Sequence, residues 1–230
     1  LPIFLFPFYP CVTLGGLMWF DNAVIYQIFP DRFYNGDVTN DTITSDARGT
    51  VQYEYMNDWY ILPENPEQIT LHPDTYPTYA YKGDGNWSNE IYGGDLKGIT
   101  KRIDYLKALG VTVIYLNPVF ESISSHRYDT SDYKNIDPIL GTLGDFEELV
   151  SVAEANNMHV VLDGVFNHVS DDSVYFDRYY EYLEDGTDTI GAYPYWAYVY
   201  DAMSEKKISK EEAEKQAKEY FTAEYGITNY

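Results

Sequence analysis

The chain has 230 residues, of which 45% are hydrophobic, and this size and composition indicate a globular protein of one large domain or slightly more. Its 15 basic and 37 acidic residues give a net charge of -22, which argues against nucleic acid and anionic membrane surfaces, because both bind basic patches. Cys11 is the only cysteine, so an intrachain disulfide and a cysteine metal cluster are excluded. Residues 1–20 are apolar but have no basic start and contain three prolines, so we expect neither a signal peptide nor membrane insertion.

The first predicted strand covers residues 23–29, a β-branched and aromatic run that Pro30 ends. Residues 31–92 are polar, rich in tyrosine and without a clear period, which indicates a long loop. Apolar side chains at helical spacing then predict a helix that ends near Gly110. These side chains are Leu96, Ile99, Ile103 and Leu106.

A second strand is predicted at residues 111–116, a second loop at 119–144 and a third strand at 159–163. Between the loop and the third strand, Asp145 and Glu148 form the capping pair of another helix. Strands that alternate with helices in this way predict an α/β fold, with a parallel sheet covered on both faces. Active sites of such folds lie at the C-terminal ends of the strands.

The strand and helix alternation stops after Ser170. Ser209 and Glu212 begin one more predicted helix, whose inner face carries Ala213 and Ala217. The C-terminal part of the chain is therefore expected to be organised differently from the sheet.

Four oxygen-bearing side chains gather in the loop after the first strand, at Asn35, Asp37, Asn40 and Asp41. Hard cations such as Ca²⁺ take six to eight oxygen ligands of this kind. The same residues also suit a plain Asn-Gly turn with solvated acids. The residues alone leave both interpretations open.

Two further polar groups follow predicted strands. His126 and Tyr128 could hold a neutral polyol ring by hydrogen bonding and stacking, or they could serve only to pin the loop. Asp163, Asn167 and His168 follow the third strand, where a buried carboxylate needs a partner or a working role. The alternative is a capped strand end with incidental polar residues.

Taken together, four stretches resemble the α-amylase family of glycoside hydrolases, in particular its neopullulanase and amylopullulanase branch. They are VIYQIFPDRFYNGDVTND, YGGDLKGITKRIDYLKALGVTVIYLNPVFES, HRYDTSDY and VVLDGVFNHV, and the match runs from about residue 22 to residue 182. The family fold is a (β/α)8 TIM barrel with a domain B inserted after the third strand. The resemblance implies that residues 21–169 form about the first three βα units, that residues 170–230 begin domain B, and that residues 1–20 are unmatched.

The resemblance also implies site residues. His126 and Tyr128 match the pair of the -1 sugar subsite, with Tyr128 stacking on the ring, and His168 matches a second contact to that sugar. Asp163 matches a supporting residue that pairs with an arginine further along the chain. Asn167 matches a calcium ligand of many α-amylases.

A Ca²⁺ site of the neopullulanase branch is implied as well, because six residues match its ligands. They are Asn35, Asp37, Asn40, Asp41, Gly93 and Asp95. The last two lie far from the others in sequence, so the cation would fasten the long first loop to the start of the first helix.

The family's retaining mechanism uses an Asp nucleophile and a Glu acid/base on later strands, and neither Gly-x-Arg-x-Asp nor Asn-His-Asp occurs in this sequence. We therefore expect a part of an α-glucan hydrolase that lacks its C-terminal remainder and is inactive alone. Its expected partners are starch, pullulan or maltooligosaccharides, with α-1,4 bonds as the first target and α-1,6 bonds as the second. The alternative is a non-catalytic α-amylase-like protein used for binding or partner assembly. Acidity and calcium favour an extracellular or cell-surface location over the cytoplasm.

Overall fold

The computed structural model describes residues 19–41, 53–63, 89–184 and 189–230. Its central sheet has three parallel strands in the order β1 (Ile25–Ile28), β4 (Val113–Leu116) and β7 (His159–Leu162). The register places their last residues side by side: Ile28, Leu116 and Leu162. The three predicted strands and their parallel arrangement are confirmed. The residues that directly follow these strands therefore lie at the same edge of the sheet.

The first predicted helix is broken into two. Helix α2 (Leu96–Lys101) and helix α3 (Ile103–Ala108) meet at Arg102, whose φ of -107° and ψ of 10° are not helical. The apolar face nevertheless continues across the break, because Leu96, Ile99, Ile103 and Leu106 are all buried.

Helix α4 (Leu143–Ala155) begins with a capping box, but its members differ from the predicted pair. Thr142 is the N-cap, and its side chain accepts a hydrogen bond from the main-chain N–H of Asp145. The Asp145 carboxylate in turn accepts from the main-chain N–H of Thr142 at 2.8 Å. The prediction that Asp145 starts the helix and pairs with Glu148 is therefore wrong, because the extended residue at position 142 already supplies the cap.

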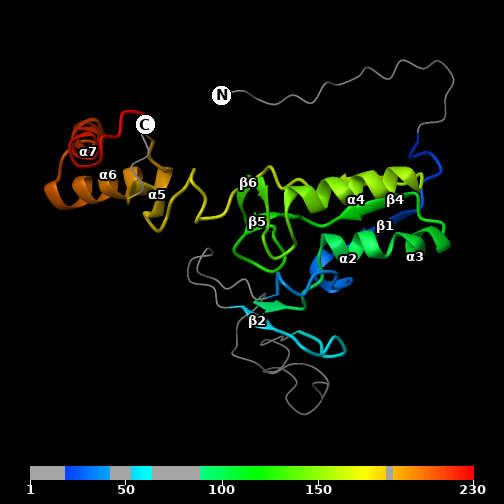
Figure 1. Cartoon of the computed structure of the whole chain (residues 1–230). Helices are drawn as coiled ribbons and strands as arrows, with labels where there is room; N and C mark the ends of the chain where they lie inside the picture. The colour runs from blue at the N-terminus through cyan, green and yellow to red at the C-terminus, as the bar shows by residue number, and fades with distance from the viewer. Residues whose placement is uncertain (1–18, 42–52, 64–88, 185–188) are drawn as a thin grey trace, which may run out of the picture.

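Helices α2, α3 and α4 run alongside β1 and β4 (Figure 1), and the buried residues of all three helices belong to one core. Their buried residues form one cluster with Ile28, Ile114 and Leu116, which point to the same face of the sheet. On the opposite face Ile25 keeps 62% of its surface exposed. Within the described residues, the predicted cover on both faces is therefore wrong.

The two predicted loops contain short strands where the structure describes them. Strands β5 (Phe120–Ser122) and β6 (Thr130–Ile136) form an antiparallel pair within the second loop. In the first loop, β2 (Glu54–Tyr55) pairs in parallel with β3 (Glu90–Ile91), and a 3₁₀ turn, η1 (Pro30–Arg32), follows β1. Residues 42–52 and 64–88 of that loop, and residues 1–18, lie outside the described residues.

Helices α5 (Glu181–Glu184), α6 (Ala192–Lys206) and α7 (Lys210–Tyr225) lie to one side of the sheet, beyond an extended segment (Figure 1). They have a hydrophobic cluster of their own, which includes Val199, Ala213 and Phe221. The predicted cap of α7 is confirmed, because the Ser209 side chain accepts from the N–H of Glu212. Helix α6 was not predicted. Across the described parts of the chain, every helix is too short or too polar to cross a membrane.

Candidate functional site

The polar residues predicted to form a sugar site meet at the C-terminal ends of β4 and β7. The Tyr128 hydroxyl donates a hydrogen bond of 2.8 Å to Oδ2 of Asp163, which directly follows β7. Asn117, which directly follows β4, donates to the same hydroxyl at 3.4 Å. Asn117 in turn accepts from the Gln27 amide of β1 at 2.8 Å. Side chains from all three strands thus join one network.

His168 holds the main chain of Tyr128. Its Nε2 lies 2.8 Å from the Tyr128 carbonyl oxygen, which can only accept, so the ring proton is on Nε2. The Nδ1 atom is then an acceptor, and the Asn167 amide donates to it at 2.6 Å. Both ring nitrogens of His168 are therefore engaged by the protein.

His126 has its hydrogen-bond donor at Nε2. The Tyr128 main-chain N–H lies 3.1 Å from Nδ1 of His126, and a main-chain N–H can only donate. Nδ1 is therefore the acceptor, and the neutral ring carries its proton on Nε2. The His126 and Tyr128 rings lie 5.9 Å apart between centroids, so the two predicted subsite residues are neighbours.

Tyr128 is 36% exposed, so part of its ring surface is free to contact a ligand. Partial burial and the hydrogen bond to Asp163 raise the pKa of Tyr128 to about 12. Burial and a hydrogen bond to the same carboxylate also raise the pKa of Tyr115, on β4. The Asp163 carboxylate thus contributes to the raised pKa of two tyrosines.

A buried arginine, which the sequence reasoning missed, sets the turn between His126 and Tyr128. Arg127 is only 1% exposed, and its Nε lies 2.8 Å from Oδ2 of the buried Asp137. Its φ of 61° is in the left-handed region, which costs energy for a residue with a side chain. The buried ion pair holds the chain in this conformation, with His126 and Tyr128 on either side. An arginine in a polar loop is ordinarily interpreted as exposed, so the sequence carries no clear signal for this role.

Tyr133 on β6 is a second residue that was missed. Its hydroxyl lies within hydrogen-bond distance of the Val165 carbonyl oxygen and 2.8 Å from the His168 carbonyl oxygen. Phe166 packs beside the Tyr133 ring, with 5.9 Å between centroids. The β5–β6 hairpin therefore fixes the loop that carries His168.

The predicted calcium residues also come together, around the start of α2. Asp95 caps this helix and accepts from the main-chain N–H groups of Gly36 at 3.1 Å, Asp37 at 2.7 Å and Gly98 at 2.5 Å. Asn35 donates to the Asp41 carboxylate at 2.9 Å. The loop of residues 35–41 is therefore docked on the helix N-terminus.

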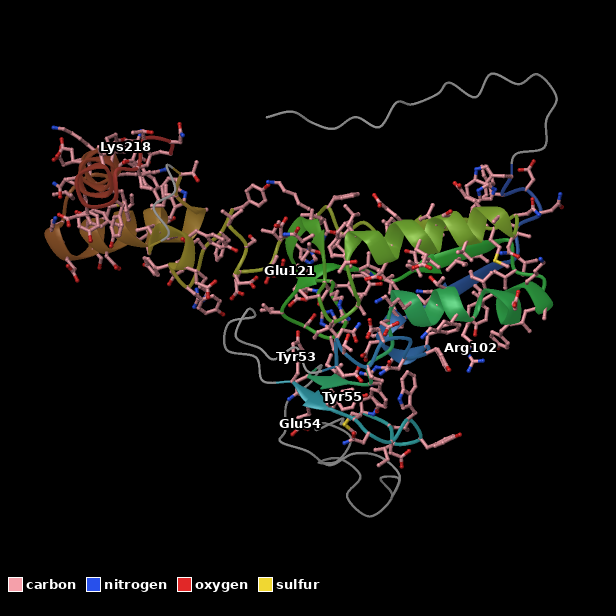
Figure 2. All side chains as sticks on the ribbon, viewed as in Figure 1. Tyr53, Glu54, Tyr55, Arg102, Glu121 and Lys218 are labelled. Atoms are coloured by element: carbon pink, nitrogen blue, oxygen red, sulfur yellow. The ribbon has the colours of Figure 1, made fainter. Side chains whose placement is uncertain are left out.

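Tyr55 and Gly93 complete this cluster. The Tyr55 hydroxyl donates to Oδ2 of Asp41 at 3.0 Å, from strand β2 (Figure 2). Gly93 has a φ of +78°, and a Cβ added to it would lie 2.5 Å from Oδ1 of Asp41 and 2.8 Å from Nδ2 of Asn35. Only a glycine therefore fits against these two side chains.

The donor set fits a hard cation in part. Oδ1 of Asn35 and Oδ1 of Asn40 are buried and have no hydrogen-bond donor, and two such oxygens beside the carboxylates of Asp41 and Asp95 suit Ca²⁺. The Asp37 carboxylate is engaged elsewhere, because Nζ of Lys97 lies 2.5 Å from it and holds its pKa below the ordinary value. Among the described residues, His, Cys, Asp and Glu form no group of three arranged to hold a metal, so amide and main-chain oxygens would have to supply the remaining ligands.

Comparison with known proteins places this chain in a family. Residues 27–224 match the family model described as alpha amylase, catalytic domain. The chain is 54% identical over 178 residues to an amylopullulanase of Thermoanaerobacterium saccharolyticum, a match that covers 77% of this chain and 13% of the relative. It is 37% identical over 183 residues to neopullulanase 2 of Thermoactinomyces vulgaris, covering 80% of this chain and 25% of that protein.

Among solved structures, the type III pullulan hydrolase from Thermococcus kodakarensis matches with a TM-score of 0.54 and 35% identity. That match covers 71% of this chain and 26% of the hydrolase. The chain thus spans about an eighth of the amylopullulanase, from the 13% coverage, and about a quarter of the structural relative. Because the family model matches most of the sequence, the chain belongs to the alpha-amylase family and carries part of its catalytic domain.

Proposed function

We propose that this chain is the first part of the catalytic barrel of an α-glucan hydrolase and that it holds one glucose ring of the substrate. The observation that carries the proposal is the network of Tyr128, Asp163 and His168 at the C-terminal ends of the parallel strands. Membership of the alpha-amylase family supports the substrate class. The proposed targets are α-1,4 bonds in starch, pullulan or maltooligosaccharides, with α-1,6 bonds as a second target.

Each residue has a distinct proposed role. The exposed part of the Tyr128 ring stacks on the apolar face of a sugar, and Nε2–H of His126 donates to a sugar hydroxyl. Asp163 fixes the Tyr128 ring through the hydroxyl and supports the catalytic centre. His168 orients the Tyr128 main chain, and its contact with the sugar requires its Nε2–H to exchange the Tyr128 carbonyl for a sugar hydroxyl.

The domain organisation is part of the proposal. Residues 21–169 form the first βα units of a (β/α)8 barrel, which the parallel order β1, β4, β7 supports. Residues 170–230 begin domain B, which the separate hydrophobic cluster of α5, α6 and α7 supports. The exposed face of the sheet, which carries Ile25, would then line the barrel interior.

The calcium site is a further part of the proposal. Asn35, Asn40, Asp41 and Asp95 would hold Ca²⁺ with the Gly93 carbonyl, and Asp37 would join after release from Lys97. The cation supplies a charge bridge between the first loop and α2. Saturating Ca²⁺ at a hundredfold excess over Kd would raise the free energy of unfolding by about 2.7 kcal/mol. Asn167 is assigned to the sugar site, since it donates to His168. An extracellular or cell-surface location is proposed from the acidity and the calcium site.

The sugar site can be tested by NMR titration of the isotopically labelled chain with maltohexaose. We expect chemical-shift changes at His126, Tyr128 and Asp163, and no matching changes with cellohexaose, whose β-1,4 linkage presents the ring differently. Tyr128→Ala should abolish the changes, whereas Tyr105→Ala, on α3, should keep them. Equal responses to the two oligosaccharides, or no response at millimolar maltohexaose, would count against the proposal.

A further inference from the structure

Asp31 is fully buried beside the proposed calcium cluster and accepts hydrogen bonds from the segment that leads into it. Its side chain is 0% exposed, and Oδ1 accepts from the main-chain N–H of Tyr92 at 2.9 Å and of Gly93 at 3.0 Å. Its main-chain oxygen accepts from the N–H of Gly94 at 3.0 Å. Three successive N–H groups are therefore held by one residue.

Arg32 makes further contacts to Asp31 and to the same segment. Its Nε lies 3.1 Å from Oδ2 of Asp31, and its Nη2 donates to the Glu90 carbonyl at 3.0 Å. The guanidinium also lies over the Tyr92 ring, 3.9 Å from the centroid. The Asp31–Arg32 pair thus fastens the segment from Glu90 to Gly94 to the end of β1.

The segment from Glu90 to Gly94 lies against the side chains of the proposed calcium cluster. Gly93 lies against the side chains of Asp41 and Asn35, and Gly94 packs so closely on the Pro30 carbonyl that a Cβ would overlap it. The next residue, Asp95, accepts the N–H groups of the loop of residues 35–41. A shift of the segment at Tyr92 and Gly93 would therefore displace one wall of the cluster relative to the other.

We propose that Asp31 is a positioning residue of the calcium site, acting through the main chain of Tyr92 and Gly93 without contacting the cation itself. The proposal rests on the calcium site of the proposed function. Groups behind the ligands commonly change metal affinity about 10- to 100-fold when they are removed, because they fix the ligands in place. The carboxylate of Asp31, completely removed from water, is compensated by the two main-chain N–H groups at Oδ1 and by the Arg32 guanidinium 3.1 Å from Oδ2.

The test is calorimetric titration of the chain with Ca²⁺ alone. The wild-type chain should bind one ion, and Asp31→Ala should raise Kd by about 10- to 100-fold. Asp31→Asn keeps an oxygen that can accept from Tyr92 and Gly93, so its Kd should stay within about threefold of wild type even if the variant is less stable. Asp177→Ala is the matched control, because Asp177 is also buried and accepts from main-chain N–H groups, but beside α5. Its Kd should not change.

The outcomes separate the two proposals. Absence of Ca²⁺ binding by the wild-type chain overturns the calcium site. Wild-type binding with an unchanged Kd in Asp31→Ala, or an Asp31→Asn Kd as weak as that of Asp31→Ala, overturns the positioning role alone. If Asp31→Ala does not fold, hydrogen exchange of the metal-free wild-type chain decides. Slow exchange at the amides of Tyr92 and Gly93 supports their hydrogen bonds to the Asp31 carboxylate. Exchange at the rate of an open loop contradicts them.

Discussion

The hydroxyl of Tyr128 donates to the carboxylate of Asp163 at 2.8 Å, joining residues that are 35 positions apart in the chain. Tyr128 lies just before β6, and Asp163 directly follows β7. The bond fixes a partly exposed aromatic ring at the edge of the sheet where the three strands end. The proposed sugar site is therefore attached to the sheet at this point, through the loop that also carries His126.

Tyr128→Phe should make the stability of the chain less sensitive to alkaline pH. The folded-state pKa of Tyr128 is raised to about 12 from an ordinary value of 10.0, so between these values the folded chain keeps a proton that the unfolded chain has lost. The stability that this group contributes is complete below pH 10 and is lost as the pH rises toward 12. Urea unfolding at pH 9, 10 and 11 measures the free energy of unfolding. Its decline with pH should be less steep in the variant, and the difference in slope should correspond to at most one proton. Parallel declines would show that the pKa of Tyr128 is not raised in the folded chain.

Asp137→Ala should strongly destabilise the chain, because it leaves the guanidinium of Arg127 buried without its partner. Removing one member of a buried ion pair costs about 3 to 5 kcal/mol. Lys215→Ala provides the control, since its pair with Glu219 is exposed and 3.9 Å long, and no measurable change is expected. Denaturant melts compare the two variants. A loss below about 1 kcal/mol for Asp137→Ala would mean that this ion pair does not hold the turn at Arg127.

Gly98→Ala and Gly144→Ala should change stability in opposite directions, although both positions are helical. A Cβ at Gly144 meets only Thr142 Oγ1 at 3.6 Å, so alanine should stabilise α4 by about 0.5 to 1 kcal/mol. A Cβ at Gly98 would overlap the Tyr34 carbonyl, so alanine should lift the loop of residues 35–41 off α2. Chemical unfolding gives the sign, and faster amide exchange at Gly36 and Asp37 should accompany the loss. If both variants were stabilised, the close docking of the loop would be refuted.

The 230-residue chain should release no reducing sugar from starch or pullulan above the buffer blank. A retaining glycosidase needs two carboxyl groups about 5 Å apart, and the family's nucleophile and acid/base motifs do not occur in this sequence. Asp163 accepts a hydrogen bond from the Tyr128 hydroxyl and is proposed as a supporting group. A reducing-end assay over several hours makes the measurement. Sustained turnover by the purified chain would place the catalytic acids within these residues.

The sequence predicted the sheet well because its strands are β-branched and aromatic runs of strand length, such as residues 111–116, bounded by turn residues. It misplaced the cap of α4, because Thr142 and Asp145 both have cap chemistry and only the main-chain conformation distinguishes them. It missed α6, where tyrosines at near-alternate positions hide the helical period.

The candidate sites could be predicted only in part, because a sequence shows local patterns of residues but not contacts between distant segments. Local clusters such as His126 with Tyr128 are visible in the sequence, and the resemblance supplied the distant Gly93 and Asp95. The buried roles of Asp31 and Arg127 depend on N–H groups and carboxylates from other segments, and no local pattern of residues encodes them.

The specificity constant of a chimeric enzyme tests the proposed sugar site most directly. In this chimera the chain replaces the matching segment of the Thermoanaerobacterium saccharolyticum amylopullulanase, to which it is 54% identical. The chimera should hydrolyse maltohexaose, and Tyr128→Ala should lower kcat/KM by about 30- to 1,000-fold, which corresponds to about 2 to 4 kcal/mol of lost transition-state stabilisation. Tyr105→Ala should stay within about threefold of the chimera. A Tyr128→Ala chimera with an unchanged kcat/KM would contradict the assignment of this site to the sugar.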